Sequence, residues 1–191
     1  MADNPTILSS KQISQEPDEL ALVRAARQDP ARFGELYQRY VERVYRYLYS
    51  RIGNVHEAED LTAQTFLAAF ESFDNFRQDA HFASWLFSIA RHKAMDHFRR
   101  GKRTPALEEI QEIPVDKDPL FEVARSEQAQ ALAALLPTLP EKERELLRLR
   151  FLAEMSFPEM ARFLHRNESA LKKSLYRLLE KLHNQLEVQD E

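Results

Sequence analysis

The 191-residue sequence contains no cysteine, three glycines and no long hydrophobic run. Without cysteine, disulfide bonds and thiolate metal sites are excluded. Three scattered glycines cannot form a glycine-rich phosphate-binding loop. No apolar run approaches the roughly 18 residues of a membrane-spanning helix, and residues 1–20 lack the basic start and apolar stretch of a secretory signal. We therefore expect a cytoplasmic protein that does not insert into a membrane.

Composition favours a folded protein with an uneven distribution of charge. Hydrophobic residues make up 43% of the chain and charged residues 30%, which is sufficient for a packed core in one medium or two small domains. The net charge of −4 at first argues against nucleic-acid binding. However, residues 81–103 carry six basic side chains against Asp96 alone, and residues 104–131 carry seven acidic side chains against Lys117 and Arg125. This segregation indicates a local basic surface followed by an acidic segment.

Helical spacing of apolar residues dominates the first half of the chain, and no β-type alternation stands out. Asp18 is the expected cap of a helix at 19–28, and Gly53 is the expected end of a long helix that starts at 31. Asn54 and Glu57 resemble a capping box that opens a third helix. We expect a loop at 73–81 and a fourth helix at 82–100.

The second half of the chain predicts a helix-turn-helix. A proline-containing acidic linker at 105–131, with a helix re-forming by about 121, precedes a helix at 141–152. Ser156 and Glu159 form a second predicted capping box, which opens a short helix that ends at Leu164. Asn167 is the expected N-cap of a last helix at 168–187. The fold expected is all-α, with two small helical domains at 18–104 and 132–187, the acidic linker between them, and tails at 1–17 and 188–191.

Aromatic and basic residues are interleaved over the predicted loop and fourth helix, a pattern that suits unpaired DNA. Exposed aromatic rings stack on bases, Arg and Lys hold phosphates, and a loop pocket can hold a flipped base. The alternative is that most of the apolar residues here, such as Phe82 and Leu86, are simply core. The candidate DNA-binding residues are Asn75, Arg77, His81, Trp85, Arg91, His92, Lys93, Asp96, Arg99 and Arg100.

Two further segments have candidate binding faces. The last helix would place its N-terminal polar residues in a major groove, although most amphipathic helical hairpins do not bind DNA. Its candidates are Asn167, Glu168, Ser169, Lys172, Lys173, Tyr176 and Arg177. Acids beside apolar residues in the third helix suit a protein-docking face, although this segment alone favours an ordinary solvated helix. Its candidates are Glu57, Glu59, Asp60, Leu61, Gln64 and Phe66.

Enzyme chemistry has little support in the sequence. His92 and His97 are five residues apart, so they lie on different faces of a helix and cannot share a metal ion. No Ser-His-Asp arrangement can be singled out. We therefore expect no catalytic residue, no metal and no cofactor.

In this order, the segments resemble the extracytoplasmic-function sigma factors of bacteria, over residues 18–104 and 132–187. A-E-D-L-T-A-Q-T-F-L at 58–67 resembles the segment of region 2 that docks on the clamp helices of the largest polymerase subunit. F-A-S-W-L-F-S-I-A-R at 82–91 and D-H-F-R-R at 96–100 resemble the segment that melts and reads the −10 element. L-P-E-K-E-R-E-L-L-R-L-R-F at 139–151 and S-F-P-E-M-A-R-F-L at 156–164 resemble region 4, which binds the −35 element.

The resemblance implies a transcription initiation factor whose partners are core RNA polymerase, including its flap, and promoter DNA. An anti-sigma factor is a further candidate partner, because the family commonly has one. The alternatives are a free-standing helix-turn-helix regulator that acts without polymerase and, with less support, a nucleotide-processing enzyme. The acidic face at 57–67 favours the sigma factor.

The sequence departs from the family pattern at several positions. Gln64 stands where the family usually has Glu, and Phe70 replaces a frequent Trp. His165 occupies a turn position normally held by Gly, and a side chain there makes a positive φ costly. Ser174 replaces a frequent Arg in the recognition helix. The pattern therefore predicts the region 4 fold more firmly than its usual −35 specificity.

Overall fold

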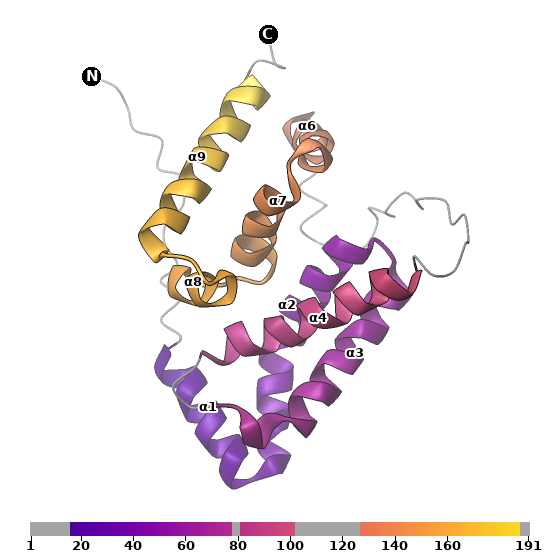
Figure 1. Cartoon of the computed structure of the whole chain (residues 1–191), viewed down its shortest axis with the longest axis vertical. Coiled ribbons are helices and arrows are strands. Elements are labelled where there is room, and N and C mark those ends of the chain that lie inside the picture. The colour runs from indigo at the N-terminus through magenta and orange to yellow at the C-terminus, as the bar shows by residue number, and fades with distance from the viewer. Residues whose placement is uncertain (1–15, 78–80, 102–126, 188–191) are drawn as a thin grey trace.

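The computed structural model describes residues 16–77, 81–101 and 127–187, and the secondary structure elements in this part of the chain are all helices. Four helices form an N-terminal unit: α1 (Glu16–Gln28), α2 (Phe33–Ile52), α3 (Val55–Glu71) and α4 (Phe82–Gly101). A C-terminal unit contains α6 (Glu127–Leu135), α7 (Glu141–Leu147), the π-helical segment η5 (Arg148–Leu152), α8 (Phe157–Leu164) and α9 (Glu168–Glu187). Figure 1 shows α8 lying between the rest of the C-terminal unit and α4. None of the described helices is both long and apolar enough to cross a membrane.

Apolar stripes at helical spacing hold the N-terminal unit together. On α2, Leu36, Tyr40, Val44, Tyr47 and Leu48 are almost fully buried, and this spacing of three and four places them on one face. The stripe packs against α1, α3 and α4, and α3 also packs against α4. The result is a four-helix bundle whose fourth helix has one buried side and one outward side.

The turn between α2 and α3 follows the sequence prediction. Gly53 ends α2 with a left-handed φ of 77°, and the Asn54 side chain accepts a hydrogen bond from the Glu57 backbone N–H at 3.1 Å. The Glu57 carboxylate instead lies 3.2 Å from Nε2 of His97. The expected cap at Asp18 is wrong, because α1 already begins at Glu16. The three-residue 3-10 helix Pro30–Arg32, with Asp29 as its cap, separates α1 from α2, so α2 begins at Phe33 rather than at 31.

The remaining predicted bounds differ in detail from the structure. A short 3-10 helix, η2 (Phe73–Asn75), opens the predicted loop, and α4 continues through Gly101. The predicted helix at 141–152 becomes η5 after Leu147. The proposed helix start near 121 and most of the acidic linker lie outside the described residues, while residues 127–131 of that linker belong to α6.

The helix-turn-helix forms as its caps predict. Ser156 and Glu159 make both hydrogen bonds of a capping box at the start of α8. His165 ends α8 with φ 52° and ψ 46°, and Asn167 caps α9 by accepting from the Ala170 N–H at 3.2 Å. Leu171, Leu175, Leu178 and Leu182 are buried along one side of α9, which leaves the opposite side of its N-terminal half outward.

The two units pack against each other, which the sequence did not predict. Helix α4 contacts α8, α2 contacts η5, and one cluster of buried side chains continues from α2 into α8 and α9. Arg43 of α2 is 8% exposed and donates from Nε and Nη2 to the Ala153 carbonyl at 2.8 and 2.5 Å. The Ser84 hydroxyl donates to the Glu159 carbonyl at 2.9 Å. We call this packing the closed arrangement.

The left-handed conformation of His165 generates a stability prediction. A Cβ atom in this region of backbone space is unfavourable by roughly 1–2 kcal/mol, and Gly avoids the clash but loses more chain entropy on folding. We therefore expect His165→Gly to raise the free energy of unfolding by about 0.5–1 kcal/mol, measured by urea denaturation followed by circular dichroism. His165→Ala is the control, since it removes the imidazole but keeps Cβ, and it should bring no such gain. A His165→Gly protein less stable than His165→Ala would contradict this account.

Candidate DNA and protein interfaces

The outward face of α3 carries acids at its start and apolar residues at its end. Glu59, Asp60 and Gln64 are exposed, and Glu57 is half-buried beside His97. Further along the same face, Leu67 is 59% exposed and Phe70 is 48% exposed. Asp60, Gln64, Leu67 and Phe70 are spaced three or four residues apart, which is the helical repeat. The acids and the apolar residues therefore form one continuous stripe along α3. Among the described residues, α3 packs mainly on α2, α4 and η2.

Two residues assigned to this face from the sequence do not reach its surface. Leu61 and Phe66 are each 5% exposed and belong to the core of the N-terminal unit. The ring of Phe66 lies 4.8 Å from that of Tyr37 on α2. They support the face through packing, so the burial corrects their assignment as direct contacts. Leu67 and Phe70 were missed, although the spacing from Asp60 and Gln64 could have found them.

The described segment 73–77, which follows α3, lies over a cluster of aromatic rings. Phe73, Phe76 and Phe82 are buried, and the half-buried Trp85 packs on them, with its ring centre 4.9 Å from that of Phe76. Asn75 and Arg77 are exposed above this cluster. Trp85 is thus partly core, and only its outer part can meet a ligand. The buried rings give the loop a rigid support.

His81 is turned away from the other loop candidates. Its half-buried side chain lies beside Glu19 of α1 and Glu159 of α8, and together they are a group of ligand atoms that could hold a metal ion. Asn75 and Arg77 are therefore exposed, as a DNA-contacting loop requires, whereas His81 faces the junction between the units.

The basic side chains of α4 divide between two sides of the helix. Arg99, Arg100 and His92 are exposed, and Lys93 and Asp96 are half-buried. Arg99 donates to Asp96 at 2.8 Å. Two exposed apolar residues that the sequence analysis missed, Met95 and Phe98, lie beside these charges. Met95 is three residues after the exposed His92, and Phe98 is three residues after Met95, so both lie on the outer side of α4. Apolar groups on this side can contact bases.

Arg91 lies on the inner side of α4, in the closed arrangement. Its guanidinium is 5.6 Å from the ring centre of Phe163 on α8. This position differs from the sequence prediction, which placed Arg91 with the DNA-facing bases. In the closed arrangement Arg91 therefore lies at the contact between α4 and α8.

Helix α9 presents a mixed polar face opposite its leucine stripe. Ser169, Lys173, Tyr176 and Arg177 are exposed, and Tyr176 is 61% exposed. Lys172 pairs with Glu168 at 2.7 Å and lies over the ring of Phe157. Asn167 is exposed but its side chain is engaged as the cap. All seven predicted residues therefore lie at or near the start of one outward helix face, with Lys173, Tyr176 and Arg177 the most accessible.

Ser174 is engaged within the helix-turn-helix itself. Its hydroxyl donates to the Ala170 carbonyl at 2.9 Å and accepts from Nη2 of Arg166 at 3.1 Å. The Arg166 side chain thus crosses the turn towards α9. Lys173 and Arg177, which lie one and three residues from Ser174 along α9, are exposed.

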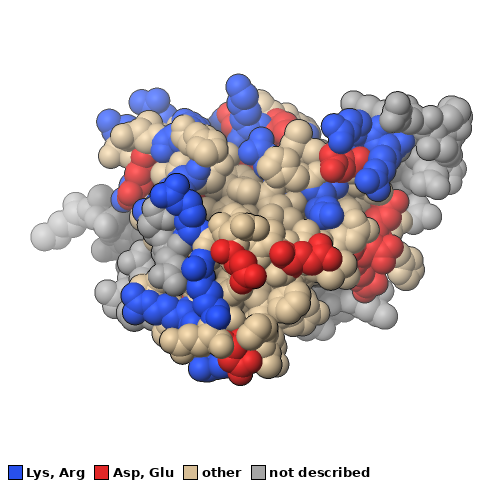
Figure 2. Space-filling model, turned by 60° about the horizontal axis from the view of Figure 1, so that its bottom comes forward, with Lys and Arg blue, Asp and Glu red and all other residues tan. Residues whose placement is uncertain are grey.

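Charges on the surface are grouped rather than uniform. On the face shown in Figure 2, Lys and Arg side chains form separate groups, with acidic side chains and uncharged surface between them. Such a surface favours several local contacts over one broad basic face.

Comparisons with known proteins agree with this order of elements. The family models for Sigma-70 region 2 and Sigma-70 region 4 match residues 36–104 and 129–182. The ECF RNA polymerase sigma factor BldN of Streptomyces coelicolor is 36% identical over 78% of this chain and 58% of its own length. SigW of Bacillus subtilis, also an ECF RNA polymerase sigma factor, is 28% identical over 83% of this chain and 90% of its own.

A solved structure supports the same fold. CnrH, in complex with the cytosolic domain of CnrY, is 27% identical, with a TM-score of 0.63. The similarity covers 89% of this chain and 97% of CnrH.

Proposed function

Because this chain belongs to the sigma-70 family, as an extracytoplasmic-function sigma factor, we propose that it directs core RNA polymerase to promoters through three separate surfaces. One surface docks on polymerase, one opens and holds the −10 element, and one binds the −35 element. The observation that carries this proposal is the presence of a striped α3 face, a basic α4 and an outward α9 on one chain. Their action is binding, and polymerase performs the chemistry.

The α3 face is the proposed docking surface for the clamp helices of the largest polymerase subunit. Its acids can pair with basic residues of a partner, and Leu67 and Phe70 supply apolar area that would be buried on docking. This combination of a charged and an apolar half fixes both orientation and affinity. Gln64 contributes no charge to it.

The loop and the outer side of α4 are the proposed −10 surface. Asn75, Arg77 and Trp85 stand over a rigid aromatic base, and Met95, Phe98, Arg99 and Arg100 extend the surface along the helix. Stacking on exposed rings stabilises unpaired bases, while arginine contacts with phosphates fix the register.

The start of α9 is the proposed −35 surface, supported by its position as the second helix of a helix-turn-helix. Lys173 and Arg177 favour phosphate contacts, because a lysine is a flexible point charge and a poorer bidentate reader of guanine than an arginine. We expect upstream binding to depend more on charge than on base identity.

The closed arrangement must open for both DNA surfaces to work together. The −10 and −35 elements are about 25 base pairs apart, which is about 85 Å at roughly 3.4 Å per base pair. By contrast, two helices in contact, such as α4 and α8, have axes about 8–10 Å apart. The two units therefore separate when the chain binds a promoter on polymerase.

Partners and location follow from this role. The chain acts in the cytoplasm, where polymerase and DNA are. CnrH was solved with the cytosolic domain of another protein bound, which supports an anti-sigma factor as a further partner. The region 4 unit is expected to contact the polymerase flap.

The proposed function is tested by run-off transcription with purified core polymerase on a genomic DNA library. We expect discrete promoter-dependent transcripts that are absent without this chain. A free-standing helix-turn-helix regulator would instead bind duplex DNA and fail to copurify with core polymerase. The region 2 match and the α3 face disfavour that alternative.

The docking surface predicts a specific loss of polymerase binding. We expect Asp60→Lys with Leu67→Ala to weaken binding at least tenfold, or about 1.4 kcal/mol, since one change reverses a charge and the other removes apolar area. Both residues are exposed, so helicity by circular dichroism should stay intact. The matched control is Glu180→Lys with Leu20→Ala, which makes the same changes at exposed positions of α9 and α1. Equal affinity of the two double variants in a pull-down titration would refute the docking assignment.

The phosphate contacts of α4 predict a changed salt dependence. Replacing Arg99 and Arg100 with Ala removes two phosphate contacts, so the slope of log affinity against log salt should flatten by roughly one to two units. The assay is promoter binding by the holoenzyme over a salt series. Arg24→Ala with Arg27→Ala removes the same charge from exposed positions of α1 and is the control. An unchanged slope for the α4 variant would exclude this surface.

The recognition helix predicts a gain of specificity at one position. Ser174→Arg should sharpen discrimination among −35 sequences by about 1 kcal/mol, because arginine can bind guanine in bidentate fashion. It also frees Arg166 from its hydrogen bond to the Ser174 hydroxyl. The measurement is promoter selection from a library randomised at −35, with Ser174→Lys as the control for added charge. If the wild-type holoenzyme already selects a tight −35 consensus, the reasoning fails.

A further inference from the structure

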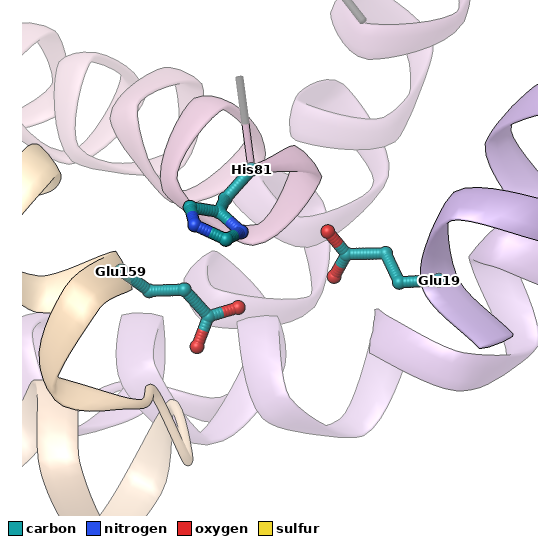
Figure 3. A group of neighbouring side chains, drawn as sticks. All are labelled: Glu19, His81 and Glu159. Atoms are coloured by element: carbon teal, nitrogen blue, oxygen red, sulfur yellow. The ribbon is translucent and has the colours of Figure 1, made fainter. Parts of the chain in front are cut away.

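Three metal-ligating side chains from distant parts of the chain meet where the two units touch. Glu19 comes from α1, His81 immediately precedes α4, and Glu159 belongs to α8. Their ligand atoms all lie within 4.8 Å of one another, and all three residues are half-buried. Figure 3 shows the His81 ring and the carboxylates of Glu19 and Glu159 facing a common space from three sides.

The two carboxylates are held in place by donors behind them. Glu19 accepts hydrogen bonds from the Phe82 backbone N–H at 3.0 Å and from the Tyr40 hydroxyl. Glu159 accepts from the Ser156 backbone N–H at 2.6 Å. Each carboxylate oxygen has a second lone pair, so these bonds orient the groups and leave capacity for another ligand.

We propose that Glu19, His81 and Glu159 bind one divalent transition-metal ion of the zinc class. One imidazole nitrogen with two carboxylate oxygens suits zinc better than calcium or magnesium, which prefer oxygen ligands alone. Ligand bonds of about 2.0–2.2 Å in a tetrahedral site place the ligand atoms about 3.3 Å apart. Small shifts of the three side chains, with the glutamate hydrogen bonds kept, would shorten the present separations, which are at most 4.8 Å. A water molecule would complete the fourth position. Pattern reading missed this site because its ligands are 62 or more residues apart in sequence.

The ion would favour the closed arrangement. Glu19 and His81 belong to the N-terminal unit and Glu159 to the C-terminal unit, so all three ligands meet only while the units are packed together. An ion that binds only the closed state stabilises it by a free energy that rises with the logarithm of the free ion concentration once that concentration exceeds Kd. This consequence rests on the proposed function, under which the open state binds the promoter. The bound ion would then reduce the transcription that this sigma factor initiates.

Isothermal titration with zinc chloride tests the site, using the full chain freed of any affinity tag. We expect one saturable site per chain in the wild type and at least a tenfold loss of affinity in Glu159→Gln. Gln is also an accepted capping-box residue, so this variant keeps the start of α8. The control is Glu154→Gln, which removes an acid that pairs with Arg46 across the same junction at 3.3 Å. Absence of a saturable site, or equal affinity in Glu159→Gln and the wild type, overturns the proposal.

Closure is measured separately by energy transfer between two dyes. Because the chain lacks cysteine, Gln38→Cys and Glu180→Cys on exposed positions of α2 and α9 can be labelled specifically. Zinc should raise the transfer efficiency with Glu159 present and leave it unchanged in Glu159→Gln. A zinc response of equal size in both proteins would overturn the link between this site and closure.

Transcription with zinc-free protein separates the two proposals. Promoter-dependent transcripts from the zinc-free chain are expected, with fewer when zinc is restored to the wild type but not to Glu159→Gln. Lack of transcripts without zinc would contradict the proposed function and leave the calorimetric result standing. Equal inhibition of both proteins by zinc would overturn the regulatory role of this site.

Discussion

The buried guanidinium of Arg43 joins the two halves of the molecule. Removing an arginine from water is costly. Here the guanidinium N–H groups of Arg43 offset this cost by donating hydrogen bonds to the Ala153 and Glu154 carbonyls, where η5 ends. Those carbonyls point out of the helix at a turn in which Glu154 has a φ of 50°. The Tyr40 ring lies 4.7 Å from the guanidinium and covers one face of it. Arg43, in the core of the N-terminal unit, therefore supplies hydrogen-bond donors to the carbonyls that end η5 in the C-terminal unit.

A second buried polar group, the Glu145 carboxylate, also joins the two units. The buried Glu145 carboxylate accepts from the Tyr47 hydroxyl at 2.8 Å and from Arg51 at 2.5 Å. Burial, and then the charge of Glu145, raises the pKa of Tyr47, so it stays a donor. Burial lowers the pKa of Arg51, but Tyr47 and Glu145 more than offset this, and its pKa is raised. Polar groups that pair well in the closed state can also be hydrated when the units separate, which a purely apolar junction would resist.

Local chemistry made much of the fold predictable, whereas contacts between distant segments were not. Gly53, Asn54, Ser156 and Asn167 act through neighbours a few residues away, so the sequence alone identified the turns they form.

The surface of α3 was half predicted. Its acids are outward, but Leu61 and Phe66 were misplaced because residue type was given more weight than the helical repeat. The burial of Arg43 could have been predicted, because its position in the helical repeat places it on the same face of α2 as Tyr40 and Tyr47. Nothing in the local pattern indicates that its partner is 110 residues away, or that the helix after Leu147 changes to a π-helix.

The position of the closed junction suggests the order in which the proposed surfaces act. The stripe on α3 lies away from α8 and η5, which pack on α4 and α2. Docking on polymerase can therefore begin without breaking the junction. Simultaneous contact with the −10 and −35 elements cannot, because α4 and α8 are held together by contacts such as Arg91 against Phe163 and the Ser84 hydrogen bond to α8. Once polymerase is bound, the α9 surface can gain its own DNA contacts as the units separate. These contacts offset the free-energy cost of breaking the junction. Under the proposed function, the junction thus delays simultaneous contact with the −10 and −35 elements until the chain is on polymerase.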